Sequence, residues 1–310
     1  ATAYGKEGYM LRLRVLLAVI VLCMVGAFVP RLRETDADES PQSGLYLVNA
    51  DGTGLTHLGE EPTETLGYWG PAWSPDGTML AVTRVDSQAL VLLRTDGTEL
   101  AQLTHNDRNN YLPVWSVDGT QLVFMSQDGS DTNTAEVAII EVDGSGERLL
   151  TDDDAWDYGA SFSPDGKQIV FGSERDGRWR LWMMNADGTD QHPLPTEAHG
   201  NAPAWSPDGT TIVFTSDRDG DDDLWAANPD GSDQRNLTSN SAHDDNAAWT
   251  PDGQHLVFSS DRTGRTEIWM IDATGEQPRQ LTDDTSLQLD NVASLSPDES
   301  ILAVTARVAT

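Results

Sequence analysis

A short motif recurs six times along the chain, and it limits the possible folds more than any other feature of the sequence. Each copy is an aromatic residue or a leucine followed by Ser-Pro-Asp-Gly or a close variant. The copies begin at Trp73, Trp115, Phe162, Trp205, Trp249 and Leu295, with 42 to 47 residues between successive starts. Proline fixes φ, aspartate bonds back to the backbone and glycine tolerates positive φ, so each copy predicts a tight turn after a strand.

A second motif alternates with the first, and it is an apolar strand that ends in an Asp-Gly turn or a variant of it. Its six copies begin at Leu45, Val91, Ala138, Leu181, Leu224 and Ile268. Because Asp-Gly between apolar segments favours a hairpin, the two motifs together predict four strands per repeat. The copy at Leu45 precedes every copy of the first motif, and the copy at Leu295 has no second motif after it. We therefore predict that both ends of the chain join in one repeat and close a ring.

These residues resemble the repeat of the TolB-like β-propeller family. The resemblance rests on Trp-Ser-Pro-Asp-Gly at 205–209, Ile-Val-Phe-Thr-Ser-Asp-Arg-Asp-Gly at 212–220 and Leu-Trp-Ala-Ala-Asn-Pro-Asp-Gly at 224–231, and it extends over residues 45–308. It implies an all-β fold, a six-bladed propeller of four-stranded blades, which we place at residues 45–310. The sequence shows no counterpart of the N-terminal α/β domain through which TolB engages its partner, so the Tol–Pal role is not implied.

The N-terminal segment predicts a membrane anchor. Residues 15–29 contain no charged side chain, and Lys6, Arg12 and Arg14 precede them. A bilayer span needs about 20 apolar residues, and we assign the transmembrane helix to residues 15–33, with 15–29 in contact with the lipid bilayer. Basic residues before the span predict a cytoplasmic tail at 1–14 and a propeller in the periplasm or outside the cell. The polar residues 34–44 form a linker. A cleaved signal peptide is the alternative interpretation.

The chain is strongly acidic, with 51 Asp and Glu against 19 Lys and Arg and a formal net charge of −32. Such a surface repels the phosphates of nucleic acids, so we expect no nucleic-acid partner. It favours cationic partners or divalent ions, although a solvated acidic surface also explains it. The single cysteine, Cys23, excludes an intrachain disulfide.

The loops that lead into the innermost strands of a propeller surround its central channel. The residues four and five positions before each motif start are therefore our candidates for a binding site at the channel mouth. They are Tyr68, Trp69, Asn110, Tyr111, Asp157, Tyr158, Asn201, Asp244, Asp245, Asp290 and Asn291. One side of this mouth would be aromatic and the other acidic or amide-bearing, which suits a cationic peptide or side chain, or a metal ion. Alternatively, these residues cap strand ends and join neighbouring blades.

Three groups of residues have the composition of metal sites. Alternating carboxylates around Gly220 predict a calcium site, although an ordinary acidic hairpin explains them as well; they are Asp217, Asp219, Asp221 and Asp223. Equivalent aspartates of three repeats could hold a divalent cation in the channel; they are Asp157, Asp244 and Asp290. Two equivalent histidines with nearby acids could bind a transition metal; they are His199 and His243, beside Asp244 and Asp245.

Sequence signatures of catalysis are missing: we find no Gly-x-Ser-x-Gly elbow, no His-Glu-x-x-His and no phosphate-binding glycine loop. We therefore predict no catalytic residue. The expected function is that of a non-enzymatic, membrane-anchored propeller, a scaffold or accessory subunit that binds a protein partner in a membrane or envelope complex. One alternative is a propeller hydrolase or lyase with a divalent cation at the channel. Another is a sensor that binds a peptide or glycan against Trp69, Tyr111 and Tyr158.

Overall fold

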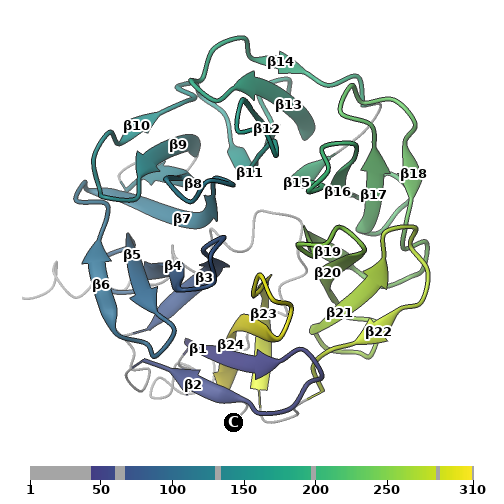
Figure 1. The fold of residues 1–310 in the computed structure, drawn as a ribbon. Coiled ribbons are helices and arrows are strands. Elements are labelled where there is room, and N and C mark those ends of the chain that lie inside the picture. Colours follow the sequence, from purple (N-terminus) through teal and green to yellow (C-terminus); the bar gives the residue numbers. More distant parts are fainter. Residues whose placement is uncertain (1–42, 60–66, 130–133, 197–199, 284–286, 309–310) are drawn as a thin grey trace, which may run out of the picture.

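The computed structural model describes residues 43–59, 67–129, 134–196, 200–283 and 287–308 (Figure 1). The predicted tail and anchor, and the linker up to residue 42, lie outside these residues. Every regular element in the described ranges is a β-strand. Among the described residues, the structure contains no helix with the length and apolarity needed to cross a membrane.

The described residues form six four-stranded sheets around a central axis, as the repeats predicted (Figure 1). Blade 1 contains β3 (Tyr68–Trp73), β4 (Met79–Arg84), β5 (Ala89–Arg94) and β6 (Glu99–Gln102). Blade 2 contains β7 (Arg108–Trp115), β8 (Gln121–Asp128), β9 (Glu136–Glu141) and β10 (Arg148–Leu149). Blade 3 contains β11 (Asp157–Phe162), β12 (Gln168–Ser173), β13 (Arg180–Asn185) and β14 (His192–Pro193). In each blade the first strand lies nearest the axis and all neighbours are antiparallel.

The remaining blades follow the same order. Blade 4 contains β15 (Asn201–Trp205), β16 (Ile212–Ser216), β17 (Asp223–Ala227) and β18 (Arg235–Asn236). Blade 5 contains β19 (Asp244–Trp249), β20 (His255–Ser260), β21 (Glu267–Asp272) and β22 (Arg279–Gln280). Blade 6 contains β23 (Leu287–Leu295), β24 (Ile301–Val308), β1 (Ser43–Asn49) and β2 (Thr56–Leu58).

Blade 6 is built from both ends of the described chain, which confirms the predicted closure. Strand β1 pairs antiparallel with β24, so that Ser43 lies opposite Arg307 and Asn49 lies opposite Ile301. Because β1 begins at Ser43, it takes in the last two residues of the predicted linker. The closed ring leaves no open end between the first blade and the last.

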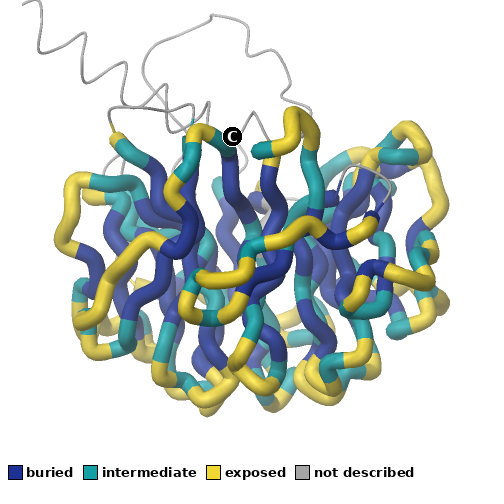
Figure 2. Tube along the Cα trace, turned by 90° about the horizontal axis from the view of Figure 1, so that it is seen from above, coloured by how far each residue is buried: buried dark blue, intermediate teal, exposed yellow. Residues whose placement is uncertain are grey.

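The hydrophobic core lies between neighbouring blades, where the motif aromatics end the innermost strands. Trp73, Trp115, Phe162 and Trp205 are all at least nine-tenths buried. The Trp115 indole N–H donates to the Ala72 carbonyl oxygen of the preceding blade at 3.0 Å. The Trp249 indole N–H makes the equivalent bond to the Ala204 carbonyl oxygen at 3.2 Å, so these two tryptophans both bury apolar area and fix neighbouring blades relative to one another. Figure 2 shows the buried strands between two exposed rims.

Two sets of turns lie at the end of the disc where the innermost strands finish, and we call this end the turn face. In the Ser-Pro-Asp-Gly turn of blade 4, the Asp208 carboxylate accepts from the Ser206 hydroxyl at 2.7 Å and from the Thr210 N–H at 3.0 Å. These hydrogen bonds lower the pKa of Asp208, and Gly209 adopts a φ of 72°. The opposite end, where the innermost strands begin, is the channel-mouth face. Ser43 and Val308 both lie at that end.

Candidate functional site

A β-bulge interrupts the innermost strand of every blade close to the channel mouth. The bulges have residues with positive φ at equivalent positions, namely Gly70, Leu112, Gly159, Ala202 and Asn246. The three non-glycine residues store backbone strain, a feature that concentrates at functional sites. Neighbouring bulges touch across the blade junctions: a Cβ added to Gly159 would lie 2.8 Å from the Ala202 Cα. The bulges of blades 3 and 4 thus adjoin one another at the wall of the channel, as do those of blades 1 and 2.

Blades 1 to 3 contribute an aromatic cluster to this wall. The rings of Trp69 and Tyr111 meet edge to face, with centroids 5.9 Å apart and an interplanar angle of 89°. Tyr158 contacts Trp179 at a centroid distance of 6.2 Å and belongs to the same apolar cluster as Tyr111. Burial raises the pKa of both tyrosines, so their hydroxyl groups stay protonated and can donate hydrogen bonds. The structure thus brings together the three aromatic residues that the sequence placed at the mouth.

Blades 4 and 5 contribute an acidic wall. The Asp245 carboxylate accepts a hydrogen bond from the Ser259 hydroxyl, and the Tyr158 hydroxyl donates to Asn246 Oδ1 at 3.1 Å from two blades away. Asp222, from the turn between β16 and β17, lies 3.3 Å from His243 Nδ1. The aromatic and acidic walls therefore meet where the Tyr158 hydroxyl contacts Asn246.

The electrostatics of the acidic wall favour a cation. Burial is the largest cause that raises the pKa of Asp245 to about 7, and the nearby charges of Asp222 and Asp244 raise it further. Burial also raises the pKa of Asp222, while His243 opposes this effect. A positive charge beside the two carboxylates would lower both pKa values and relieve their repulsion.

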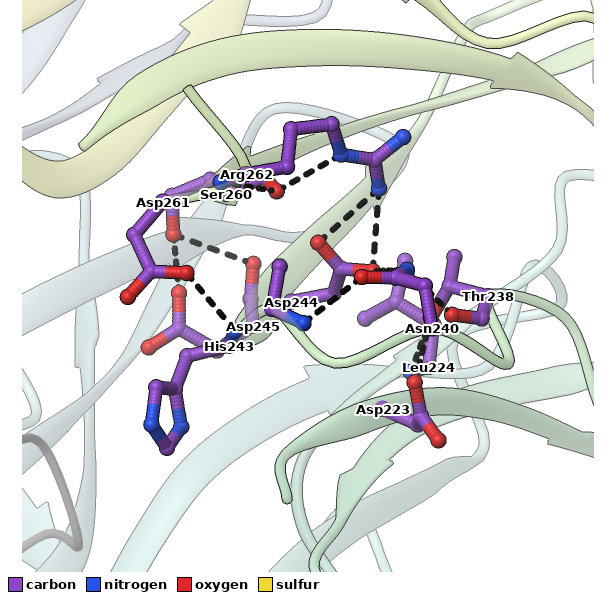
Figure 3. Close-up of polar contacts among 12 residues, drawn as sticks. Asp223, Leu224, Thr238, Asn240, His243, Asp244, Asp245, Ser260, Asp261 and Arg262 are labelled. Carbon is purple, nitrogen blue, oxygen red and sulfur yellow. Dashed lines mark hydrogen bonds and ion pairs between the residues drawn. The ribbon is translucent and has the colours of Figure 1, made fainter. Parts of the chain in front are cut away.

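Side chains alternate along a strand, so the residues five positions before each motif start point to the opposite side of the innermost strand from those four positions before it. Asp244 is fully buried, and both of its oxygens accept from Arg262 at 2.9 Å while one also accepts from Asn240 at 2.7 Å (Figure 3). The Arg262 guanidinium lies 4.6 Å from the centre of the Trp269 ring. Figure 3 shows the Arg262 guanidinium directed at the Asp244 carboxylate, with the His243 ring pointing away from it. Asp244 thus joins the parts of a blade and does not line the channel.

Asp157 and Asp290 occupy the same position in blades 3 and 6 and have the same kind of partner. Arg175 lies 2.6 Å from Asp157, and Arg307 lies 3.7 Å from Asp290. Burial raises the pKa of Asp290 to about 6, and Arg307 opposes this effect. The structure therefore distributes Asp157, Asp244 and Asp290 over three blades, each beside its own arginine, and does not bring them together around one cation.

The structure places the remaining predicted mouth residues, Tyr68, Asn110, Asn201 and Asn291, in different surroundings. The Tyr68 hydroxyl donates to Glu99 on the outermost strand of its blade at 3.3 Å. Asn110 is fully buried and accepts from the Ser126 hydroxyl at 2.8 Å. Asn201 is half-buried at the start of β15. Asn291 lies in β23, but its side chain is outside the described part of the structure, as is the whole of His199.

The predicted calcium loop does not converge on one point in the described structure. Asp223 is buried and accepts from Asn236 at 2.8 Å and from Thr238 at 3.3 Å, so its carboxylate is held by the outermost strand of its own blade and the residues that follow it. Within the described ranges, the three carboxylates that lie within 4.8 Å of one another are those of Glu136, Asp153 and Asp157.

A guanidinium group already supplies the positive charge in that second cluster. Arg175 lies 3.0 Å from Asp153 as well as 2.6 Å from Asp157. Burial raises the pKa of Glu136 to about 7, which the hydrogen bond from the Thr151 hydroxyl at 2.7 Å opposes. We therefore interpret the cluster as an ion-paired blade junction.

Sequence reasoning missed several residues of the mouth. Asp222 and Trp179 come from the turns between the second and third strands. These turns lie between the two motifs, so the motif spacing does not show which of their residues reach the channel. Ser259 belongs to a second strand, where its pairing with Asp245 places it. Asn246 could have been found, because it aligns with Gly70 and Gly159, and glycine recurring at one position indicates positive φ.

Comparisons with known proteins agree with this architecture. A family model described as the TolB beta propeller domain matches residues 35–202 and 195–310. A protein assigned as TolB from Agrobacterium tumefaciens has a similar structure, with a TM-score of 0.73 and 22% sequence identity over 88% of this chain and 100% of that one. TolB from Acinetobacter baumannii gives a TM-score of 0.60 and 19% identity over 87% of this chain and 64% of that one.

An oligogalacturonate lyase in complex with manganese is also similar, with a TM-score of 0.59 and 17% identity over 83% of this chain and 80% of that one. Identities this low show the fold alone, and a search of curated proteins found no match. The two family-model matches nevertheless cover all of the repeats and most of the chain. The chain therefore belongs to the TolB beta propeller domain family.

Proposed function

We propose that this chain is a protein-binding module that takes a cationic segment of its partner into the channel mouth. One observation carries the proposal: Asp222 and Asp245 lie in the same wall, where the charge of Asp222 raises the pKa of Asp245, next to the aromatic cluster that contains Tyr158. Two half-buried carboxylates that repel each other gain free energy when a cation approaches. Aromatic faces also attract lysine and arginine side chains, most strongly where water is excluded.

The charge of the whole chain supports the same partner chemistry. A formal net charge of −32 steers cationic partners towards the surface and repels anionic ones. In this proposal the bound cation keeps both mouth carboxylates ionised, so that uptake of the partner releases protons near neutral pH.

The proposed setting is the outer side of a membrane. Residues 15–29 hold the chain in the bilayer, and the propeller serves as a scaffold or accessory subunit of a membrane or envelope complex. The position of Ser43 supports this arrangement, because the chain enters the propeller at the channel-mouth face. The mouth is then on the side from which the anchor arrives.

An enzymatic function has less support from the side chains. A hydrolase or lyase that used a divalent cation at the channel would need convergent ligands. Asp157, Asp244 and Asp290 instead lie apart, each beside its own arginine. A glycan sensor would use the aromatic wall, but it would not explain the adjacent acidic wall.

Calorimetric titration of the full chain in mild detergent tests the proposal, with a lysine-rich peptide and a neutral peptide of equal length as probes. We expect salt-dependent binding of the basic peptide, weakened about tenfold or more by Asp245→Asn. Asp208→Asn removes an acid of the turn face and serves as the matched control for non-specific attraction. Equal loss of binding in both variants, or no loss in Asp245→Asn, would contradict the proposed site. Mass spectrometry of proteins that co-purify from native membranes would then identify the partner.

A further inference from the structure

A pocket with a volume of about 280 Å³ lies on the turn face, at the junction of blades 5 and 6. His255, Met270 and Arg279 line it from the second, third and fourth strands of blade 5. Asp272 closes one side at the end of β21, and Glu299 projects from the turn between β23 and β24. The pocket is at the opposite end of the disc from the channel mouth, so it is independent of the proposed protein-binding site.

Two pocket residues depart from the repeat. Glu299 stands where the other five copies of the first motif have glycine, and it keeps the left-handed backbone with a φ of 60°. Glutamate is strained in this conformation, whereas glycine is not. His255 is the first residue of a second strand, and none of the equivalent residues of the other repeats is a histidine; they are Met79, Gln121, Gln168, Thr211 and Ile301. Exceptions to a repeat that share one pocket indicate a function rather than a requirement of the fold.

The cation of the pocket is the Arg279 guanidinium, which has N–H groups left to bind a ligand. The Arg279 guanidinium lies 3.5 Å from the Ala50 carbonyl oxygen and 3.4 Å from the Met270 sulfur. Within the part of the chain that the structure describes, it forms no ion pair, although the chain has 51 acidic side chains against 19 basic ones. A guanidinium group can bind a carboxylate through two parallel hydrogen bonds, and the imidazole of His255 adds another polar group in the same pocket.

The two carboxylates of the pocket are oriented by backbone N–H groups. Asp272 accepts from the Thr274 hydroxyl at 2.6 Å and from the N–H groups of Thr274 and Glu276 at 2.9 Å, and these bonds hold its pKa below the ordinary value. Glu299 accepts from the N–H of Asp252 at 3.3 Å. Two carboxylates and a guanidinium in one pocket match a ligand that carries both charges. A ligand without net charge also avoids long-range repulsion by a chain with a net charge of −32.

We propose that this pocket binds a small zwitterion of the amino-acid type. The ligand carboxylate lies on Arg279, its ammonium group lies towards Glu299 and Asp272, and its side chain packs on Met270. The thioether of methionine adapts to side chains of different shape, so we expect a preference for apolar amino acids without strict selection among them.

Titration of the full chain in mild detergent tests this site, with free glycine, leucine and methionine as zwitterions and with acetate and methylamine as single-charge probes. We expect saturable binding of the zwitterions with a Kd of about 1 mM or below, and weaker binding of both single-charge probes. Arg279→Gln should weaken binding about tenfold to a hundredfold, because a charged hydrogen-bonding partner is lost. Arg235→Gln changes the equivalent residue of blade 4 and should have no effect.

A second variant keeps the test interpretable if Arg279→Gln lowers stability. Glu299→Gly restores the residue of the other five repeats, so it should fold at least as well as the parent chain, and it should still weaken zwitterion binding severalfold. The proposal is overturned if no zwitterion binds saturably, if Arg279→Gln binds like the parent chain, or if acetate binds as tightly as glycine. Asp245→Asn should leave this binding unchanged, which separates it from the channel mouth.

Discussion

Replacing Asp245 by asparagine should stabilise the propeller at pH 8 and have little effect near pH 4. Burial raises the pKa of Asp245 from the ordinary 3.8 to about 7. Between these two pH values the folded chain holds a proton that the unfolded chain has released. Stability therefore falls as the pH rises through this window and levels off above about 7. Asparagine cannot ionise, so the variant does not undergo this loss.

The size of the effect follows from the same values. At about 1.4 kcal/mol for each tenfold change in the protonation equilibrium, the raised pKa sets an upper limit of about 4 kcal/mol. The Asp245 side chain is only half-buried by accessible area, because it lines the channel. Solvent screening reduces the effect, and we expect a gain of about 1–2 kcal/mol for the variant at pH 8. Ser259 can still donate its hydrogen bond to the asparagine side chain.

Urea unfolding followed by tryptophan fluorescence measures this gain, with the difference between variant and parent taken at pH 4.5 and at pH 8. The difference cancels the contributions of Glu136 and Asp290, whose pKa values are also raised. Asp208→Asn is the opposite control. The pKa of Asp208 is lowered, so its contribution is present at neutral pH and is lost as the pH falls. The electrostatic argument would be refuted if Asp245→Asn did not raise the free energy of unfolding at pH 8, or if it raised it by the same amount at both pH values.

Two further predictions concern the blades themselves. Arg262→Gln leaves the buried Asp244 without its ion pair, and we expect a loss of about 3 kcal/mol in the free energy of unfolding. This value is near the lower end for broken buried ion pairs, because Asn240 still donates a hydrogen bond to Asp244. A loss below about 1 kcal/mol in denaturant unfolding would show that the pair contributes little. Gly159→Ala should cost about 2–3 kcal/mol, since it combines a φ of 64° with a Cβ 2.8 Å from the backbone of the next blade. Gly166→Ala, with a φ of 68° and nothing within 4 Å, should cost about 1 kcal/mol, and equal losses in denaturant unfolding would contradict the packing argument.

The repeats predicted the fold because each local rule acts six times. Pro-Asp-Gly turns, Asp-Gly hairpins and a spacing of 42 to 47 residues leave little freedom, and the position of the copy at Leu45 predicts the closure. The N-terminal anchor at 15–33 and the sidedness of the propeller stay predictions, because they concern residues outside the described structure.

The candidate site was predictable only in part. Spacing identified Trp69, Tyr111 and Tyr158, but it treated the residues four and five positions before each motif start as one group. Strand alternation separates them, so that Asp245 lines the channel while Asp244 pairs with Arg262. Asp222 reaches the mouth from a turn of variable length, and no local rule specifies where such a turn folds. The pairing of three buried aspartates with arginines of their own blades likewise depends on tertiary packing that no local rule specifies.

The construction of blade 6 has a consequence for synthesis of the protein. Strand β1 emerges from the ribosome before the other described strands, and its partner β24 emerges after all of them. Until then β1 can pair with β2 alone and presents an unpaired edge, which is a template for aggregation. Blades 1 to 5 can form while the chain is still being translated, but the ring cannot close before translation has passed β24. A nascent chain stalled after blade 5 would therefore need protection by a chaperone, whereas the completed ring would not.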